Sequence, residues 1–163
     1  MNQPNMNIKT FVRVAMLTAL ATVLTLFPQI PAGNGYVHFG DCVIYLAAIF
    51  LGPVPGALVG AIGHGLADII SGYAIFAIPT LIIKGLLGFV IGKLLFGQPL
   101  TLWRLVSAAL VALLIVMLGY FLAELLLYGI SGAILCLFSS PIQWLMSAIA
   151  SAILIPILKR MEL

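Results

Sequence analysis

The chain has 163 residues, of which 64% are hydrophobic and only 7% are charged, and its formal net charge is +3. A soluble domain of this length needs a charged surface, which so few ionisable side chains do not supply. The basic residues form no run longer than Lys159-Arg160, so the positive charge does not indicate a nucleic-acid partner. The mean hydropathy of +1.29 indicates a membrane protein.

Apolar stretches follow one another along the chain, and about 20 helical residues are enough to cross a bilayer. We predict six transmembrane helices joined by short connections rich in Gly and Pro, at residues 10–27, 39–52, 55–72, 77–96, 103–128 and 141–159. The alternating ten-residue pattern of a membrane β-barrel does not occur, so helices must satisfy the backbone. The sequence therefore predicts an all-α polytopic membrane protein with residues 1–163 in a single domain.

The basic residues predict the orientation in the membrane. Six spans put both termini on one side, together with every basic residue except Lys84: Lys9, Arg13, Lys93, Arg104, Lys159 and Arg160. The opposite connections, 28–40, 71–78 and 129–140, contain no Lys or Arg. By the positive-inside rule, both termini are predicted to be cytoplasmic.

Four ionisable residues fall near the outer ends of four different predicted helices, at a rise of about 1.5 Å per residue. These residues are Asp41, Asp68, Lys84 and Glu124. A charge that faces lipid costs about 2.5–3.5 kcal/mol near the helix centre, so we expect these side chains to share one pocket in the outer leaflet. The alternative is that Asp68 and Lys84 form only a structural ion pair between two helices.

Further polar and aromatic side chains are expected at the same depth. Tyr120 shares a helix face with Glu124, and Gln143 and Trp144 begin the sixth span, while Tyr73 precedes the fourth. Charge, hydrogen bonds and stacking surfaces together suit a flat, polar heterocycle. Tyrosines at this depth also occur as interfacial belt residues, which is the competing interpretation.

The connection that reads "GNGYVHFGD" (residues 33–41) carries Tyr36, His38 and Asp41 behind a Gly-Asn-Gly turn. A loop that opens and closes over a ligand needs mobile backbone and polar side chains, so we interpret it as a lid. The alternative is a plain hairpin whose polar residues meet water. His64 lies deeper in the membrane, on the glycine-rich face of the third span, and is expected to be a packing residue.

The sequence predicts no catalytic, cofactor or metal site. No serine or cysteine nucleophile has a base at a recognisable spacing. The segment from Gly88 to Lys93 is one residue too short for a phosphate loop. Cys42 and Cys136 lack the spacing of a metal site. If ATP drives uptake, other subunits must hydrolyse it.

Three stretches carry a family resemblance: "GNGYVHFGDCVIYLAAIFLGP", "GALVGAIGHGLADIISGYAIFAIPTLIIKGLLGFVIG" and Ala15-Met-Leu-Thr-Ala19. Over nearly its whole length the chain resembles the substrate-binding S components of energy-coupling factor (ECF) vitamin transporters. The resemblance implies a six-helix protein of the bacterial cell membrane that captures a vitamin at the outer face. It also implies docking, through the Ala15/Ala19 face, on a membrane coupling subunit (T component) with two cytoplasmic ATPases.

The subgroup that the chain resembles suggests hydroxymethylpyrimidine or a B6 vitamer such as pyridoxine as substrate, with riboflavin as the alternative. A membrane scaffold without transport activity is the competing class, and a membrane enzyme comes third. The residues expected to bind substrate are Tyr36, His38, Asp41, Asp68, Tyr73, Lys84, Tyr120, Glu124, Gln143 and Trp144.

Overall fold

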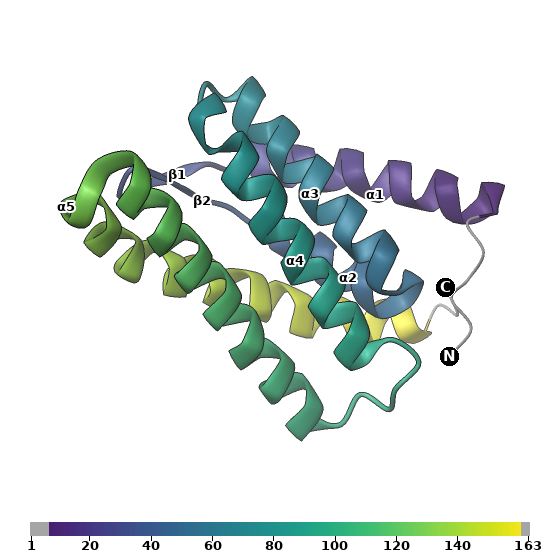
Figure 1. Ribbon diagram of the computed structural model, residues 1–163. Coiled ribbons are helices and arrows are strands. Elements are labelled where there is room, and N and C mark those ends of the chain that lie inside the picture. The colour runs from purple at the N-terminus through teal and green to yellow at the C-terminus, as the bar shows by residue number, and fades with distance from the viewer. Residues whose placement is uncertain (1–6, 161–163) are drawn as a thin grey trace.

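The computed structural model describes residues 7–160, which form a helical bundle with one small hairpin (Figure 1). The helices are α1 (Ile8–Leu26), α2 (Asp41–Leu51), α3 (Pro53–Ile70), α4 (Ala77–Leu95) and α5 (Leu102–Arg160). The 3-10 turn η1 (Ala74–Phe76) precedes α4, and the strands β1 (Ile30–Ala32) and β2 (Gly35–Val37) connect α1 to α2. The all-α prediction is confirmed except for this two-stranded hairpin.

Helix α5 is a helical hairpin. Gly129 has φ 71° and ψ −169°, which interrupts the helix, and Figure 1 shows the second half of α5 running back beside the first. The predicted 129–140 connection is therefore wrong, because residues 130–140 are already helical. The single residue Gly129 makes the turn, because glycine adopts a positive φ without steric cost. Pro141 lies inside the helix, where membrane proteins tolerate proline.

The other predicted spans begin and end within two residues of the observed helices. Four helical elements, α1, α3, η1 with α4, and α5, are long and apolar enough to cross a membrane. Helix α2 has 11 residues and is shorter. Nine residues of α2 are buried, so this helix lies inside the bundle, as expected for a helix that is apolar on all sides.

Helices α3 and α4 pack with their backbones in direct contact. A Cβ added at Gly60 would collide with the carbonyl oxygen of Lys84, and one at Gly88 would collide with that of Gly56. Small residues at such positions let two membrane helices approach closely. This packing fixes the position of Lys84, on α4, relative to the polar end of α3.

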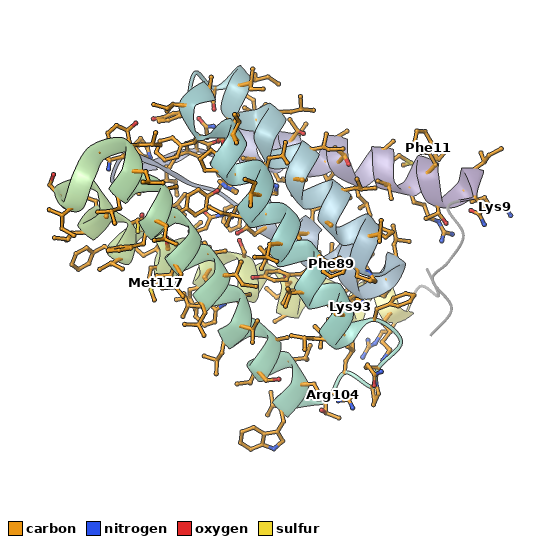
Figure 2. All side chains as sticks on the ribbon, viewed as in Figure 1. Lys9, Phe11, Phe89, Lys93, Arg104 and Met117 are labelled. Atoms are coloured by element: carbon orange, nitrogen blue, oxygen red, sulfur yellow. The ribbon has the colours of Figure 1, made fainter. Side chains whose placement is uncertain are left out.

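Two apolar clusters share α2 between them. One joins α2 to α4 and α5 around Leu87 and Ile91, and the other joins α2 to α1 and α3 around Val43 and Val59. Large apolar side chains also cover the outside of the bundle, as the sticks in Figure 2 show. An apolar exterior of this kind suits contact with lipid chains.

Candidate functional site

The β1–β2 hairpin lies across one end of the bundle (Figure 1). Its strands are antiparallel and pair Ile30 with Val37 and Ala32 with Gly35, and Gly33 in the turn has φ 63°. Side chains two residues apart in an extended chain point to the same side. Asn34, Tyr36 and His38 follow this spacing, and they contact the first half of α5, α3 and the second half of α5, respectively.

Two of these contacts reach carboxyl groups. The Asn34 amide nitrogen donates to Glu124 Oε2 of α5 at 2.8 Å, and the Tyr36 hydroxyl donates to Asp68 Oδ1 of α3 at 2.6 Å. Burial, followed by the neighbouring Asp68 carboxylate, raises the pKa of Tyr36 well above its usual value, so its hydroxyl keeps the proton. The alternative interpretation, a plain hairpin whose polar residues meet water, is therefore wrong.

The third contact joins the hairpin to the second half of α5. The backbone N–H of His38 donates to Gln143 Oε1 at 2.7 Å, and the side chains are 6% and 5% exposed. The ring Nδ1 of His38 accepts from the backbone N–H of Gly40 at 3.0 Å, which assigns the proton to Nε2. Burial lowers the pKa of His38 well below its usual value, so the ring is neutral at physiological pH.

A cavity of about 70 Å³ lies between the hairpin and the helices. The lining residues come from both strands of the hairpin, α3, α4, both halves of α5 and the segments that follow β2 and α3: Ala32, Gly35, Tyr36, His38, Asp68, Tyr73, Phe76, Thr80, Lys84, Val116, Tyr120, Glu124, Ser139, Ser140 and Gln143. Asp68, Lys84 and Glu124 thus line the same space, as the depth argument predicts. The cavity brings together eight of the ten residues expected to bind substrate.

Lys84 is bound to Asp41 and not to Asp68. Its ammonium donates to both carboxylate oxygens of Asp41 at 2.7 Å, and both side chains are 1% exposed. The alternative interpretation, an Asp68–Lys84 ion pair, is therefore wrong, because the first turn of α2 brings Asp41 to the ammonium instead. Asp41 itself is buried beneath the cavity and is not among the residues that line it.

The two carboxyl groups that line the cavity have no cationic partner. Among residues 7–160, the only lysine or arginine in an ion pair is Lys84, which is held by Asp41. Asp68 Oδ2 is buried and has no hydrogen-bond partner in the described part of the chain. Glu124 receives the amide of Asn34 at one oxygen. The polar side of the cavity is therefore rich in acceptors.

Aromatic rings form the rest of the cavity wall. The rings of Tyr36 and Tyr73 have centroids 5.0 Å apart with an interplanar angle of 57°. The Tyr120 hydroxyl lies 3.1 Å from that of Thr80, and the ammonium of Lys84 lies 5.4 Å from the centroid of the Tyr120 ring. These groups offer flat surfaces and hydroxyls close to the carboxyl groups.

Trp144 lies outside the cavity. Its indole N–H donates to the carbonyl oxygen of Ala109 at 2.7 Å, across the two halves of α5. The predicted stacking of this ring on a ligand has no counterpart in the structure, because the indole turns toward the packed interior. Gln143, one residue earlier, points into the cavity instead.

His38, Asp41 and His64 form a compact buried cluster, with one donor atom of each within 4.8 Å of the others. His64 donates from Nδ1 to the carbonyl oxygen of Gly60 at 3.0 Å, as expected for a packing residue. Its Nε2 lies 3.1 Å from Asp41 Oδ1 without the orientation of a hydrogen bond. Lys84 occupies both oxygens of Asp41, and Nδ1 of His38 already accepts a hydrogen bond, so these groups of the cluster are paired within the protein.

Sequence reasoning missed Asn34, Thr80 and Phe76. Thr80 lies four residues before Lys84 and so shares its helix face, which was a usable signal. Asn34 gave no signal of its own, because its role depends on how the hairpin folds. Ala15 and Ala19 are exposed on α1, where a partner could reach them.

Comparison with known proteins shows the family to which the chain is related. Residues 5–161 match the sequence model of the family described as the ECF-type riboflavin transporter, S component. A Lactococcus lactis subsp. cremoris protein described as the thiamine precursor transporter HmpT is 29% identical over 96% of this chain and 91% of its own length. A Pyrococcus woesei protein encoded in the gap 3′ region is 36% identical over 76% of this chain and 82% of its own length.

The fold also matches a solved structure. The crystal structure of FolT bound with folic acid aligns with a TM-score of 0.62 at 15% identity, over 86% of this chain and 90% of FolT. Membership of the ECF transporter S-component family implies a vitamin substrate and an ECF coupling module as partner. It also means that the chain is a transporter subunit and not an enzyme. The chain therefore belongs to the family of ECF transporter S components, the substrate-binding membrane subunits of vitamin uptake systems.

Proposed function

We propose that this S component captures a small single-ring vitamin or vitamin precursor, either hydroxymethylpyrimidine or a B6 vitamer such as pyridoxine, beneath the β1–β2 hairpin. The observation that carries the proposal is the acceptor-rich, aromatic cavity of about 70 Å³. At 10–15 Å³ for each water-sized group, this volume holds about five to seven such groups. That capacity is closer to one substituted six-membered ring than to a fused three-ring system with a tail.

The chemistry of the cavity supports a ligand that donates hydrogen bonds. Asp68 and Glu124 can accept from ring N–H, amino or hydroxymethyl groups, while the rings of Tyr36, Tyr73 and Tyr120 contact the face of the heterocycle. An anionic ligand would meet these carboxyl groups without a free cation, because the ammonium of Lys84 is held by Asp41. We therefore expect neutral or cationic rings to bind best.

The relatives support two substrates. HmpT, which aligns with nearly the whole chain, is described as a thiamine precursor transporter, and this favours the pyrimidine. The family description names riboflavin, which is the second candidate. Riboflavin would need a larger space, so the hairpin would have to stand open while it is bound.

Transport follows from capture in this proposal. The chain crosses the membrane six times, with Gly129 dividing α5 into two spans, and both termini are cytoplasmic because the basic residues gather at one end of the bundle. A T component docks on the exposed Ala15/Ala19 face of α1, and two cytoplasmic ATPases drive delivery. The hairpin end of the bundle then faces outward and admits the ligand.

Calorimetric titration of the purified chain with hydroxymethylpyrimidine, pyridoxine and riboflavin tests the substrate. We expect one of the two single-ring compounds to bind at nanomolar concentration and at least 100-fold more tightly than riboflavin. Glu124→Gln should weaken that binding, whereas Tyr128→Phe, one turn further along the same helix and outside the cavity, should not. Nanomolar binding of riboflavin with none of the smaller rings would overturn the assignment.

A further inference from the structure

A second cavity, of about 250 Å³, lies between α2, the end of α4 and the two halves of α5. Its lining is almost wholly apolar: Tyr45, Ile49, Ile91, Leu95, Leu102, Leu105, Val106, Ala108, Ala109, Ala148, Ser151, Ala152 and Ile155. The hydroxyl of Ser151 is used within its own helix, where it donates to the Ser147 carbonyl oxygen at 2.7 Å. This cavity shares no residue with the one beneath the hairpin, and vitamin capture does not use it.

The position of the second cavity suits access from the lipid. It lies where α4 ends and α5 begins, and Figure 1 shows the two halves of α5 separating toward this end. At its mouth Leu102 is 73% exposed and Val106 is 41% exposed, so the opening is apolar. An apolar space that opens sideways in a membrane protein is suited to a hydrocarbon chain.

Three exposed cations lie at this end of the bundle. Arg104 precedes the lining residue Leu105 in the first turn of α5, and Lys159 follows Ile155 by one turn, whereas Lys93 projects from the side of α4 opposite the lining residues Ile91 and Leu95. Figure 2 shows Lys93 and Arg104 at the same end of the bundle. Within residues 7–160, none of the three forms an ion pair with a carboxylate. Arg104 donates a hydrogen bond to the neutral amide oxygen of Gln98, and the ammonium of Lys93 lies 5.4 Å from the centroid of the Phe89 ring. An anion at the mouth of the cavity would therefore meet the charges of Arg104 and Lys159.

We propose that this second cavity binds an anionic phospholipid, with an acyl chain between the halves of α5 and the phosphate beside Arg104 and Lys159. The apolar wall selects a hydrocarbon chain, and charge complementarity at the mouth selects an anionic headgroup over a zwitterionic one. Long basic side chains reach headgroups in this way while their stems lie along apolar surface. The bound lipid fills the space between the two halves of α5 and supports their packing.

The test is native mass spectrometry of the purified full chain titrated with phosphatidylglycerol or phosphatidylcholine. The wild-type chain should retain one phosphatidylglycerol and prefer it over phosphatidylcholine. Arg104→Gln should reduce this preference about fivefold, equivalent to about 1 kcal/mol for one cation near a headgroup. Lys9→Gln, on the exposed start of α1 and lining neither cavity, should leave the preference unchanged.

Filling the cavity gives the second half of the test. Ala152→Phe and Val106→Phe should each abolish retention of the lipid, whereas Ile153→Phe, the exposed neighbour outside the cavity, should retain it. Circular dichroism and thermal unfolding in detergent verify that each variant is folded. Equal retention of the two lipids, or equal loss in Ile153→Phe, would overturn the proposal. Loss of assembly with the coupling module, with lipid retention unchanged, would instead assign this surface to a partner helix.

Discussion

The ammonium of Lys84 lies 2.7 Å from both carboxylate oxygens of Asp41, and each of these side chains is 1% exposed. The pair joins α4 to the first turn of α2, directly beneath the cavity. Because each charge satisfies the other, neither has to be neutralised by a ligand. The pair thus joins two helices next to the cavity, and the proposed function assigns recognition to Asp68 and Glu124, which line it.

Removing the lysine should destabilise the protein strongly. Lys84→Met leaves Asp41 buried without its partner, which is expected to lower the free energy of unfolding by about 3–5 kcal/mol. Thermal and denaturant unfolding in detergent would measure the loss. Lys93→Met, which removes an exposed lysine from the same helix, should change stability by no more than about 0.5 kcal/mol. A Lys84→Met protein as stable as the wild type would contradict the ion-pair assignment.

Tight packing of α3 against α4 predicts a second stability effect. Gly88→Ala puts a methyl group against the Gly56 backbone, so the helices must move apart at a cost of about 1–3 kcal/mol. Gly35→Ala is the matched control, because a Cβ there meets no atom within 4 Å and its φ is not positive. Equal unfolding temperatures for the two variants would show that the helices are not in backbone contact.

The hairpin turn predicts an effect on the rate of capture. Gly33 has φ 63°, whereas proline requires a φ near −65°, so Gly33→Pro should distort the turn that carries Asn34 and Tyr36. If the hairpin acts as a lid over the cavity, the association rate of the ligand should fall about tenfold or more, since Asn34 and Tyr36 are then misplaced. Stopped-flow fluorescence would follow this rate. Gly97→Pro, at φ 68° in the α4–α5 connection, should bind at the normal rate.

The buried histidine of the hairpin predicts a dependence of stability on pH. The folded protein holds the pKa of His38 well below its usual value, chiefly through burial, so the unfolded chain binds the proton more readily. The stability that depends on His38 is therefore complete above a pH of about 6.5 and is lost as the pH falls below it, by up to about 1.36 kcal/mol per pH unit.

Comparison with His38→Gln isolates this effect from the charges nearby. Asp41, His64 and Lys84 share the surroundings of His38, and they remain in the variant. The free energy of unfolding should fall less between pH 7.5 and pH 5.5 in His38→Gln than in the wild type. Identical pH profiles for the two proteins would mean that the ring is not buried in its neutral form.

The sequence predicts most of the fold because apolar length determines where membrane helices lie. It does not predict the uninterrupted helix through Pro141, since proline in water-soluble proteins ends a helix and in this bundle it does not. The separation of Asp68, Lys84 and Glu124 along three helices was enough to predict their shared cavity, because helical rise converts sequence position into depth.

The partners within that cavity could not be predicted from the sequence. Asp41 and Asp68 lie at similar depths, so depth alone does not decide which one meets Lys84; the close α2–α4 packing does. Trp144 and Gln143 are adjacent, yet a helical step of about 100° sends one side chain toward Ala109 and the other into the cavity. The hairpin contacts of Asn34 and Tyr36 depend on strand pairing that short, glycine-rich segments do not specify.

Mass spectrometry of the small molecules that leave the protein on denaturation tests the central claim most directly, namely that the cavity beneath the hairpin binds a single-ring heterocycle. The wild-type chain, purified from cells, should release a pyrimidine or pyridine compound in near-stoichiometric amount. Asp68→Asn, folded to the same extent, should release little or none. Release of no such compound by the wild type, or equal release by the variant, would contradict the account.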